Sequence, residues 1–268
     1  MSDYLMLKEP NLVEWLSENT TFPNTMVDRI TPRLNDDAIA EIKALSGKHE
    51  TPIVGTEEFS EWIITDNFIT PRPDWESAGV LFVPDVASFE DRKLRLLNAS
   101  HSFLAYAGQL AGYRYVHESI ADDNLRQQVN ELWDETAMKI SGPAANTLEE
   151  YRNALLDRFS VKQMRHDLSQ IAMDGSVKLR ERLIPILLDR EHRKLASPHT
   201  CRAIAAWFTF IQQSIQEGIK PNDPQAAYLM NAVNNSLNSD LCCKKLAQLV
   251  GLPDEWLSQV SSYQTAII

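Results

Sequence analysis

The chain has 268 residues, of which 44% are hydrophobic and 24% charged, an ordinary balance for one large soluble domain. No apolar run approaches the roughly 20 residues that span a bilayer, and the N-terminal residues do not resemble a secretory signal, so we expect a cytoplasmic protein. The formal net charge of −11 argues against a nucleic-acid partner, because an acidic protein repels phosphate backbones.

Strand signals are few and lie in the first hundred residues. Short apolar runs bounded by turn residues are found at Thr51–Val54, Phe59–Ile64 and Gly79–Val83. The segment Thr70–Trp75 is expected to be a loop within the domain and not a domain boundary. These runs predict a small β-element and no large sheet.

Helical patterns dominate the rest of the chain. Ser88 followed by Asp91 is similar to a capping box and predicts a helix that begins near Ser88. A stripe of apolar residues at helical spacing predicts a second helix, which carries Leu125, Val129, Leu132 and Thr136. Further helices are expected over 147–158 (with Thr147 and Glu150 as a capping box), 177–190, 200–217, 223–237, 240–250 and 253–260. We therefore predict a mainly α-helical protein with one domain over residues 1–268.

The sequence lacks the common signatures of metal and nucleotide sites. Its three cysteines, Cys201, Cys242 and Cys243, have no CxxC spacing, and there is no HExxH, so we expect reduced thiols and no metal site. A strand followed by GxGxxG and a helix, which marks a dinucleotide-binding unit, is also absent. On this ground we expect no Rossmann domain in this chain.

One helical segment carries a set of residues suited to catalysis. On an α-helix, Glu90, Asn98 and His101 fall between about 60° and 140° from Lys93. A carboxylate, an amide, an imidazole and an amine then share one face, with Leu97 among them. The alternative is a surface Glu–Lys pair, an exposed asparagine and a core histidine.

Several segments resemble the mannitol dehydrogenase family, the polyol-specific long-chain dehydrogenases. The stretch KLRLLNASHSFLAYAG, which starts at Lys93, is similar to the family signature of a lysine, an asparagine five residues later and a histidine three further. FPNTMVDRITP at Phe22–Pro32 and GVLFVPDVASFED before the helix also resemble the family. QIAMDGSVK at Gln170–Lys178 resembles its fructuronate reductase branch. These segments occur in the family's order over most of residues 10–190.

The resemblance implies the substrate-binding and catalytic C-terminal domain of an NAD-dependent, metal-independent oxidoreductase, with a multi-helical fold like the C-terminal domain of 6-phosphogluconate dehydrogenase. It implies that Lys93 is the general acid/base, which requires that desolvation or nearby positive charge lower a lysine's pKa. Asn98 would donate a hydrogen bond to the reacting oxygen. His101 would bind substrate hydroxyls, and Glu90 would relay or gate the proton path.

The same resemblance implies the substrate contacts. Val27 and Asp28 would line the seam between two domains, although Asp28 beside Arg29 is equally well explained as a local ion pair or helix cap. Lys178 would reach the far end of the substrate. Gln170 stands where mannitol 2-dehydrogenases carry an arginine, which favours D-fructuronate and D-mannonate over a polyol.

A carboxylate on the substrate requires a cationic partner. Lys178, together with His166 or Arg182, would meet that carboxylate, but a solvated helix face is the alternative for His166 and Arg182. The other functions that the sequence leaves open are a dehydrogenase of mannitol, arabinitol or sorbitol, and a non-catalytic helical module that binds sugars or a partner.

The expected partner of this chain is a dinucleotide-binding domain, in cis or in trans. In the family, such a domain precedes this region and holds NAD(H), and we expect it to be absent here. The chain would then be a truncated product of a longer enzyme or one half of a split enzyme.

Overall fold

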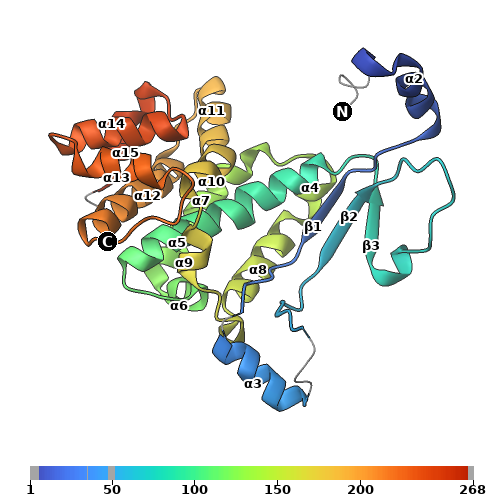
Figure 1. Ribbon diagram of the computed structural model, residues 1–268, viewed down its shortest axis with the longest axis horizontal. Coiled ribbons are helices and arrows are strands. Elements are labelled where there is room, and N and C mark those ends of the chain that lie inside the picture. Colours follow the sequence, from blue (N-terminus) through green and yellow to red (C-terminus); the bar gives the residue numbers. More distant parts are fainter. Residues whose placement is uncertain (1–5, 35, 48–51, 265–268) are drawn as a thin grey trace.

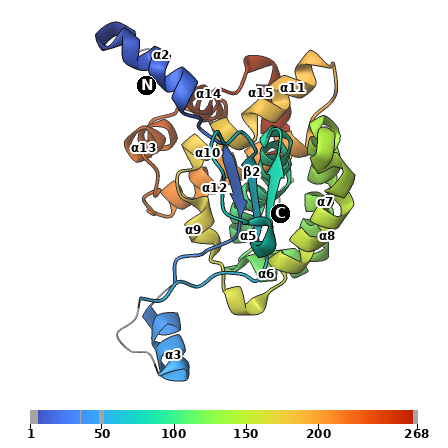
Figure 2. The same cartoon turned by 90° about the vertical axis from the view of Figure 1, so that its right-hand side faces the viewer.

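A helical body packs against one face of a small sheet in the computed structural model, which describes residues 6–34, 36–47 and 52–264 (Figure 1). The strands are β1 (Thr25–Asp28), β2 (Glu61–Thr65) and β3 (Val80–Val83). The central strand β2 pairs antiparallel with β1 and parallel with β3. Side chains alternate across a strand, so the buried Met26 and Ile63 face the helices while Val27 and Trp62 are exposed on the other face. Figure 2 shows the strands in front of the helical body.

The body is built from helices that follow the sheet in the chain. They are α4 (Ala87–Arg92), η2 (Lys93–Asn98), α5 (Ala99–Leu110), α6 (Val116–Ala121), α7 (Asp123–Thr136), α8 (Leu148–Phe159), α9 (Leu168–Ala172), α10 (Gly175–Arg182), α11 (Ile184–His192), α12 (Pro198–Gln216), α13 (Ala226–Asn234), α14 (Ser239–Val250) and α15 (Asp254–Tyr263). No helix in the described part of the chain is long and apolar enough to cross a membrane.

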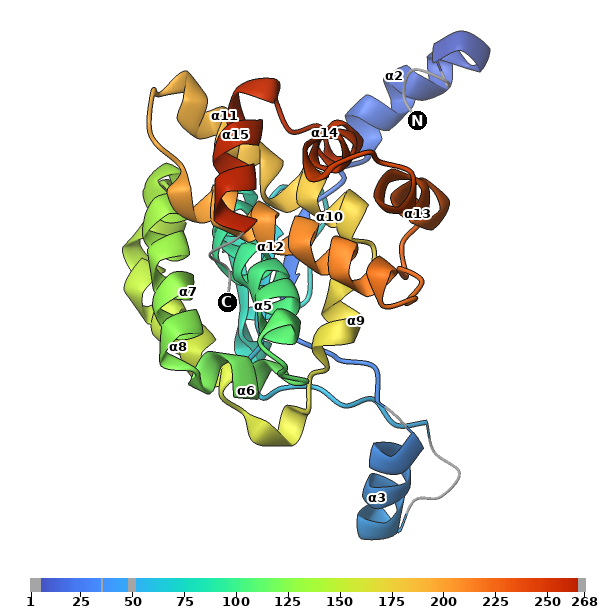
Figure 3. The same cartoon turned by 90° about the vertical axis from the view of Figure 1, so that its left-hand side faces the viewer.

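Helix α5 lies at the centre of the body. Every residue from Ala99 to Gly108 is buried, and α12 packs beside it, surrounded by the outer helices (Figure 3). Alanine and glycine along α5 allow neighbouring helices to approach closely. The tryptophans Trp133 of α7 and Trp207 of α12 are fully buried around this axis. The central helix therefore holds residues of the predicted site rigidly.

The predicted helices are mostly confirmed, but their caps are not. The stripe of α7 is buried as its spacing predicts, and α8 lies within one residue of the predicted 147–158. Thr147 precedes α8 without a side-chain cap, so the capping box there is wrong. The same holds for Ser88, because α4 begins at Ala87, whose amide donates to the Asp85 side chain at 3.1 Å.

Pro185 divides one predicted helix in two. The segment 177–190 was expected to be continuous, but α10 ends at Arg182 and α11 begins at Ile184 with the proline in its first turn. A proline has no amide proton to donate to the preceding turn, and its ring clashes with that turn. The break sets the direction in which α10 presents its side chains.

The first eighty residues depart most from the predictions. The runs at Phe59–Ile64 and Gly79–Val83 coincide with β2 and β3, whereas residues 52–54 form no strand and Thr51 lies outside the described residues. Strand β1 and the helices α2 (Pro10–Asn19) and α3 (Asp36–Ser46) were not predicted. Both of these helices stand away from the body in all three views.

Candidate active site

The helix that carries the candidate catalytic residues contains a π-helical segment. Residues Lys93–Asn98 form η2, and the amide of Ala99 donates to the carbonyl of Leu94, five residues earlier. Lys93 and Asn98 thus stand at the two ends of one wide turn between α4 and α5. The α-helical angles expected from the sequence do not hold across this segment. π-segments of this kind occur frequently at functional sites.

Side chains from helix α7 stabilise the π segment. A π turn displaces carbonyl groups from the regular i to i+4 ladder, and buried carbonyls require other donors. The hydroxyl of Thr136 donates to the carbonyl of Arg95, and the indole nitrogen of Trp133 to that of Leu96, each at 3.0 Å. The irregular backbone is therefore held by tertiary contacts.

The Lys93 side chain crosses from the helix to the sheet. Its Nζ donates to the carbonyl of Val27 in β1 at 2.5 Å, so the structure brings these two predicted site residues together. The Val27 side chain is 49% exposed and lies opposite the exposed Trp62 in β2. Glu90 is exposed on α4, about one helical turn before Lys93. The ammonium group is thus held by the backbone of an edge strand.

Asp28 points the other way, into the body. Its carboxylate is fully buried and accepts hydrogen bonds from Arg158 Nη2 at 2.8 Å and from the hydroxyl of Tyr151. Arg158 also donates to Glu57 from Nε and Nη2, both at 2.8 Å. Asp28 is thus paired with Arg158 of α8 and not with its neighbour Arg29. Its predicted substrate contact stays a prediction.

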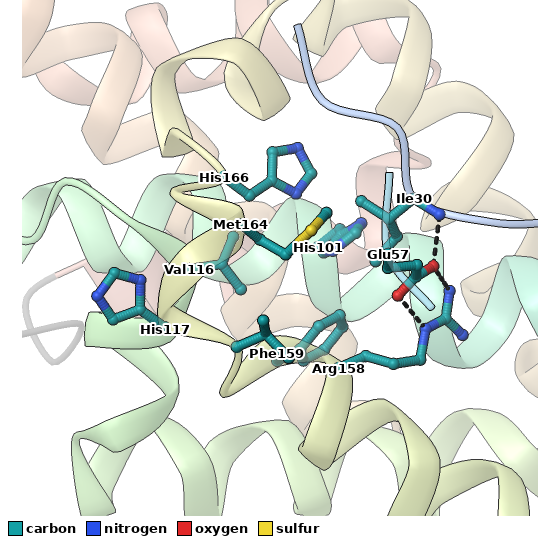
Figure 4. Close-up of a pocket in the computed structure, with 10 residues that line it drawn as sticks. Ile30, Glu57, His101, Val116, His117, Arg158, Phe159, Met164 and His166 are labelled. Atoms are coloured by element: carbon teal, nitrogen blue, oxygen red, sulfur yellow. Dashed lines mark hydrogen bonds and ion pairs between the residues drawn. The ribbon is translucent and has the colours of Figure 1, made fainter. Parts of the chain in front are cut away.

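His101 is buried beside a small cavity that is lined by both apolar and ionisable side chains. Its ring stacks on Phe159 at 4.8 Å and meets His166 edge-on at 5.4 Å, around a cavity of about 10 Å³ that is just large enough for one water (Figure 4). Burial lowers the pKa of His101 well below its ordinary value, and the nearby His166 and Arg182 lower it further. The imidazole is therefore neutral at pH 7, and its buried Nε2 has no hydrogen-bond partner among the described residues.

Lys178 and Arg182 lie one turn apart on α10. Lys178 donates to the carbonyl of Ile171 at 3.0 Å, and Arg182 Nη1 donates to Ser102 Oγ at 3.2 Å, with the carbonyl of Asn98 at 3.5 Å. Burial lowers the pKa of both Lys178 and Arg182. Arg182 therefore connects α10 with the end of the π segment, and neither residue belongs to a solvated helix face.

Gln170 contacts the backbone of Arg33, shortly before α3. Its amide accepts from the Arg33 amide at 3.2 Å and donates to the Arg33 carbonyl at 3.0 Å. These atoms line a cleft of about 270 Å³ beside α3. Among the described residues no hydrogen bond joins Gln170 to Lys93, and the predicted substrate contact of Gln170 stays a prediction. Among the described residues, no group of three or more His, Cys, Asp or Glu side chains is placed to hold a metal ion.

Sequence reasoning missed the pairing of Arg158 with Asp28 and Glu57. Arg158 and Asp28 are 130 residues apart in the chain. In the sequence each stands beside a residue of opposite charge, Asp28 next to Arg29 and Arg158 next to Asp157, so a local ion pair would explain either one. The buried arginine on α8 is visible only once the sheet is placed against the helices.

Comparison with known proteins places this geometry in a class of oxidoreductases. The family model described as the mannitol dehydrogenase C-terminal domain matches residues 85–264, about two thirds of the chain, and that of the mannitol dehydrogenase Rossmann domain matches residues 3–77. The chain belongs to the mannitol dehydrogenase family.

Individual relatives agree with this assignment. The chain is 36% identical to D-mannonate oxidoreductase of Escherichia coli (strain K12) over 97% of its own length and 54% of that protein. It is 35% identical to mannitol 2-dehydrogenase of Phaeosphaeria nodorum over 89% of its length and 43% of that protein. The solved structure of Pseudomonas fluorescens mannitol 2-dehydrogenase with NAD and D-mannitol superposes with a TM-score of 0.85 at 26% identity, covering 99% of this chain and 56% of that one. The chain spans about half the length of the curated relatives it matches.

The match at residues 3–77 corrects one prediction. The sequence was expected to contain no Rossmann domain, and the NAD-holding domain was expected to be absent from the chain; both expectations are wrong. The motif GxGxxG marks only the glycine-rich turn that approaches the pyrophosphate, so its absence does not exclude the rest of such a domain. The matched residues include β1 and β2 but no such glycine motif, so a fingerprint search could not find them.

Proposed function

We propose that this chain provides the acid/base and substrate-binding groups of an NAD-dependent oxidoreductase that interconverts a secondary alcohol and a ketone. The observation that carries the proposal is the π segment, with Lys93 at one end, anchored on the Val27 carbonyl, and Asn98 at the other. In oxidation the Lys93 amine accepts the hydroxyl proton, and in reduction its ammonium returns a proton to the carbonyl oxygen. The Asn98 amide donates to the same oxygen.

His101 and Glu90, the other two predicted catalytic residues, have surroundings that support the roles proposed for them. Neutral His101 offers one donor and one acceptor nitrogen, which suits a substrate hydroxyl. Its Nε2 is buried and has no hydrogen-bond partner among the described residues. Exposed Glu90, about one turn from Lys93, exchanges the proton with solvent.

The surface beside Lys93 fits the nicotinamide of NAD(H). Exposed Val27 and Trp62 offer an apolar surface to a flat ring, and the carbonyl of Val27 holds the ammonium of Lys93. Bound NAD⁺ supplies the acceptor for the hydride of the alcohol carbon. Holding the alcohol beside this surface is the task of this chain's own residues.

We further propose D-fructuronate and D-mannonate as the substrates. The departure at Gln170 favours a sugar acid, and the 36% identity with D-mannonate oxidoreductase extends over nearly the whole chain. Burial of the cationic Lys178 near His101 also supports an anionic substrate.

The test is NADH oxidation with D-fructuronate and with D-fructose, measured on this chain. Lys93→Ala should reduce turnover at least a hundredfold, because general acid/base catalysis contributes about 10²–10⁴. Lys162→Ala, at an exposed lysine, is the matched control. Activity within tenfold of wild type in Lys93→Ala would refute the role of Lys93. Faster turnover of fructose than of fructuronate would favour a polyol dehydrogenase. No redox activity with either compound would favour a sugar- or partner-binding module.

A further inference from the structure

Arg182 is a half-buried guanidinium group without an ion-pair partner. The buried Arg92, Arg95 and Arg158 each contact a carboxylate within 4.0 Å. Arg182 has no such contact with any described residue, and Glu181 acts on it only from a greater distance. Removing a cation from water costs free energy unless an anion compensates, so a permanently charged arginine in this state is poised for an anionic ligand.

The guanidinium is held by one nitrogen and presents two others. Nη1 is the nitrogen that contacts Ser102 and the Asn98 carbonyl. Nε and Nη2 have no hydrogen-bond partner among the described residues, and neither is sealed from solvent. These two nitrogens form the edge that binds a carboxylate through two parallel hydrogen bonds.

A second cation close to Arg182 also lacks a carboxylate partner. Lys178 lies one turn away on α10 and also has no ion pair, although Asp174 and Asp223 act on it from a distance. The positive charges of Arg182 and Lys178 both reach His101, whose buried Nε2 is unpartnered. Arg182 therefore lies against the Asn98 carbonyl, and the charges of Arg182 and Lys178 both act on the unsatisfied imidazole of His101.

We propose that Arg182 is the specificity-determining residue that binds the substrate carboxylate, with Lys178 beside it. This inference rests on the proposed sugar-acid function and assigns the carboxylate end of the substrate to α10. Contact of Arg182 with the Asn98 carbonyl places the carboxylate end close to the oxygen-binding end of the π segment. A neutral polyol leaves the free edge of Arg182 without an anionic partner, so the site binds a polyol less tightly than a sugar acid.

D-Mannonate and D-mannitol are suitable probes because they share a carbon skeleton and differ at one end, carboxylate against hydroxymethyl. Their binding to the full chain is measured by titration calorimetry. Arg182→Gln should weaken mannonate binding ten- to a hundredfold, since a hydrogen bond to a charged group contributes about 1.5–3 kcal/mol. Mannitol binding should change less than threefold. Arg182→Lys should recover part of the loss, and Arg193→Gln, at an exposed arginine, should change neither ligand.

Each other outcome overturns the inference in a distinct way. Equal weakening of both ligands in Arg182→Gln would make Arg182 a structural support of Asn98. Unchanged mannonate binding in Arg182→Gln would place the carboxylate elsewhere while the sugar-acid function stands. Failure of the wild-type chain to bind mannonate, or a preference for mannitol, would overturn the sugar-acid function and this inference together.

Discussion

Replacing Arg158 by methionine should strongly destabilise the fold. Arg158 Nη2 contacts Asp28 Oδ1 and Glu57 Oε1 at 2.8 Å each, so these two oxygens lie no more than about 5.6 Å apart. Without the guanidinium, two buried negative charges at that separation repel each other by about 3 kcal/mol at an effective dielectric constant of 20. Breaking a buried pair typically costs about 3–5 kcal/mol, and we expect a loss of this size.

Urea unfolding followed by circular dichroism gives the free energy of unfolding. Arg152→Met is the matched control on the same helix, because Arg152 pairs with Asp134 and Glu149, whose side chains are 72% and 76% exposed. This control should cost at most about 1 kcal/mol. Adding Glu57→Gln to Arg158→Met removes the repulsion and should recover about 3 kcal/mol. A loss in Arg158→Met no larger than in the control would refute the reasoning.

Three further predictions concern other parts of the fold. Burial lowers the pKa of His166 from 6.5 to about 4, so between these pH values the unfolded chain binds a proton that the folded chain does not. The free energy of unfolding should therefore fall by up to about 3 kcal/mol as the pH drops from 6.5 to 4. Urea unfolding at several pH values should show that this free energy depends less on pH in His166→Phe. A Cβ at Gly175 would lie 2.3 Å from Trp207 Nε1, so Gly175→Ala should cost about 1–3 kcal/mol, and an unchanged melting temperature would contradict this close approach. The side chain of Asn238 caps α14 through the Leu241 amide at 2.9 Å; Asn238→Ala should cost about 1 kcal/mol in urea unfolding, whereas Asn238→Asp should retain most of the stability.

Periodic local patterns predict much of this fold, because they depend only on neighbours in the chain. The stripe of α7 could be assigned a helix and a buried face from spacing alone. The π segment could not, since its carbonyls depend on Trp133 and Thr136 at about forty residues' distance. A pattern that assumes a constant helical angle has no means of detecting a change of helix type.

The candidate site was predictable to a similar extent. The residue types around Lys93 predict acid/base chemistry, and that role stays a prediction; the structure places Lys93 and Asn98 at the two ends of the π segment. The Val27 carbonyl that holds the ammonium is a backbone atom of a four-residue strand, which leaves no side-chain signal. Arg182 could not be distinguished from a surface arginine, because its lack of a carboxylate partner is a property of the folded chain.

The wide turn of η2 has a consequence for how this site can change over evolutionary time. A π turn holds one residue more than an α turn, so loss of one residue there would restore an uninterrupted α-helix. Residues beyond the deletion would keep nearly their present direction, because the π turn already absorbs the extra residue and an α turn with one residue fewer spans nearly the same angle. His101 would therefore stay close to its present direction relative to Lys93. A deletion in the regular helix between Asn98 and His101 would instead turn His101 by about 100° about the helix axis. The wide turn is thus the part of this helix whose length can change while the two halves of the site stay aligned.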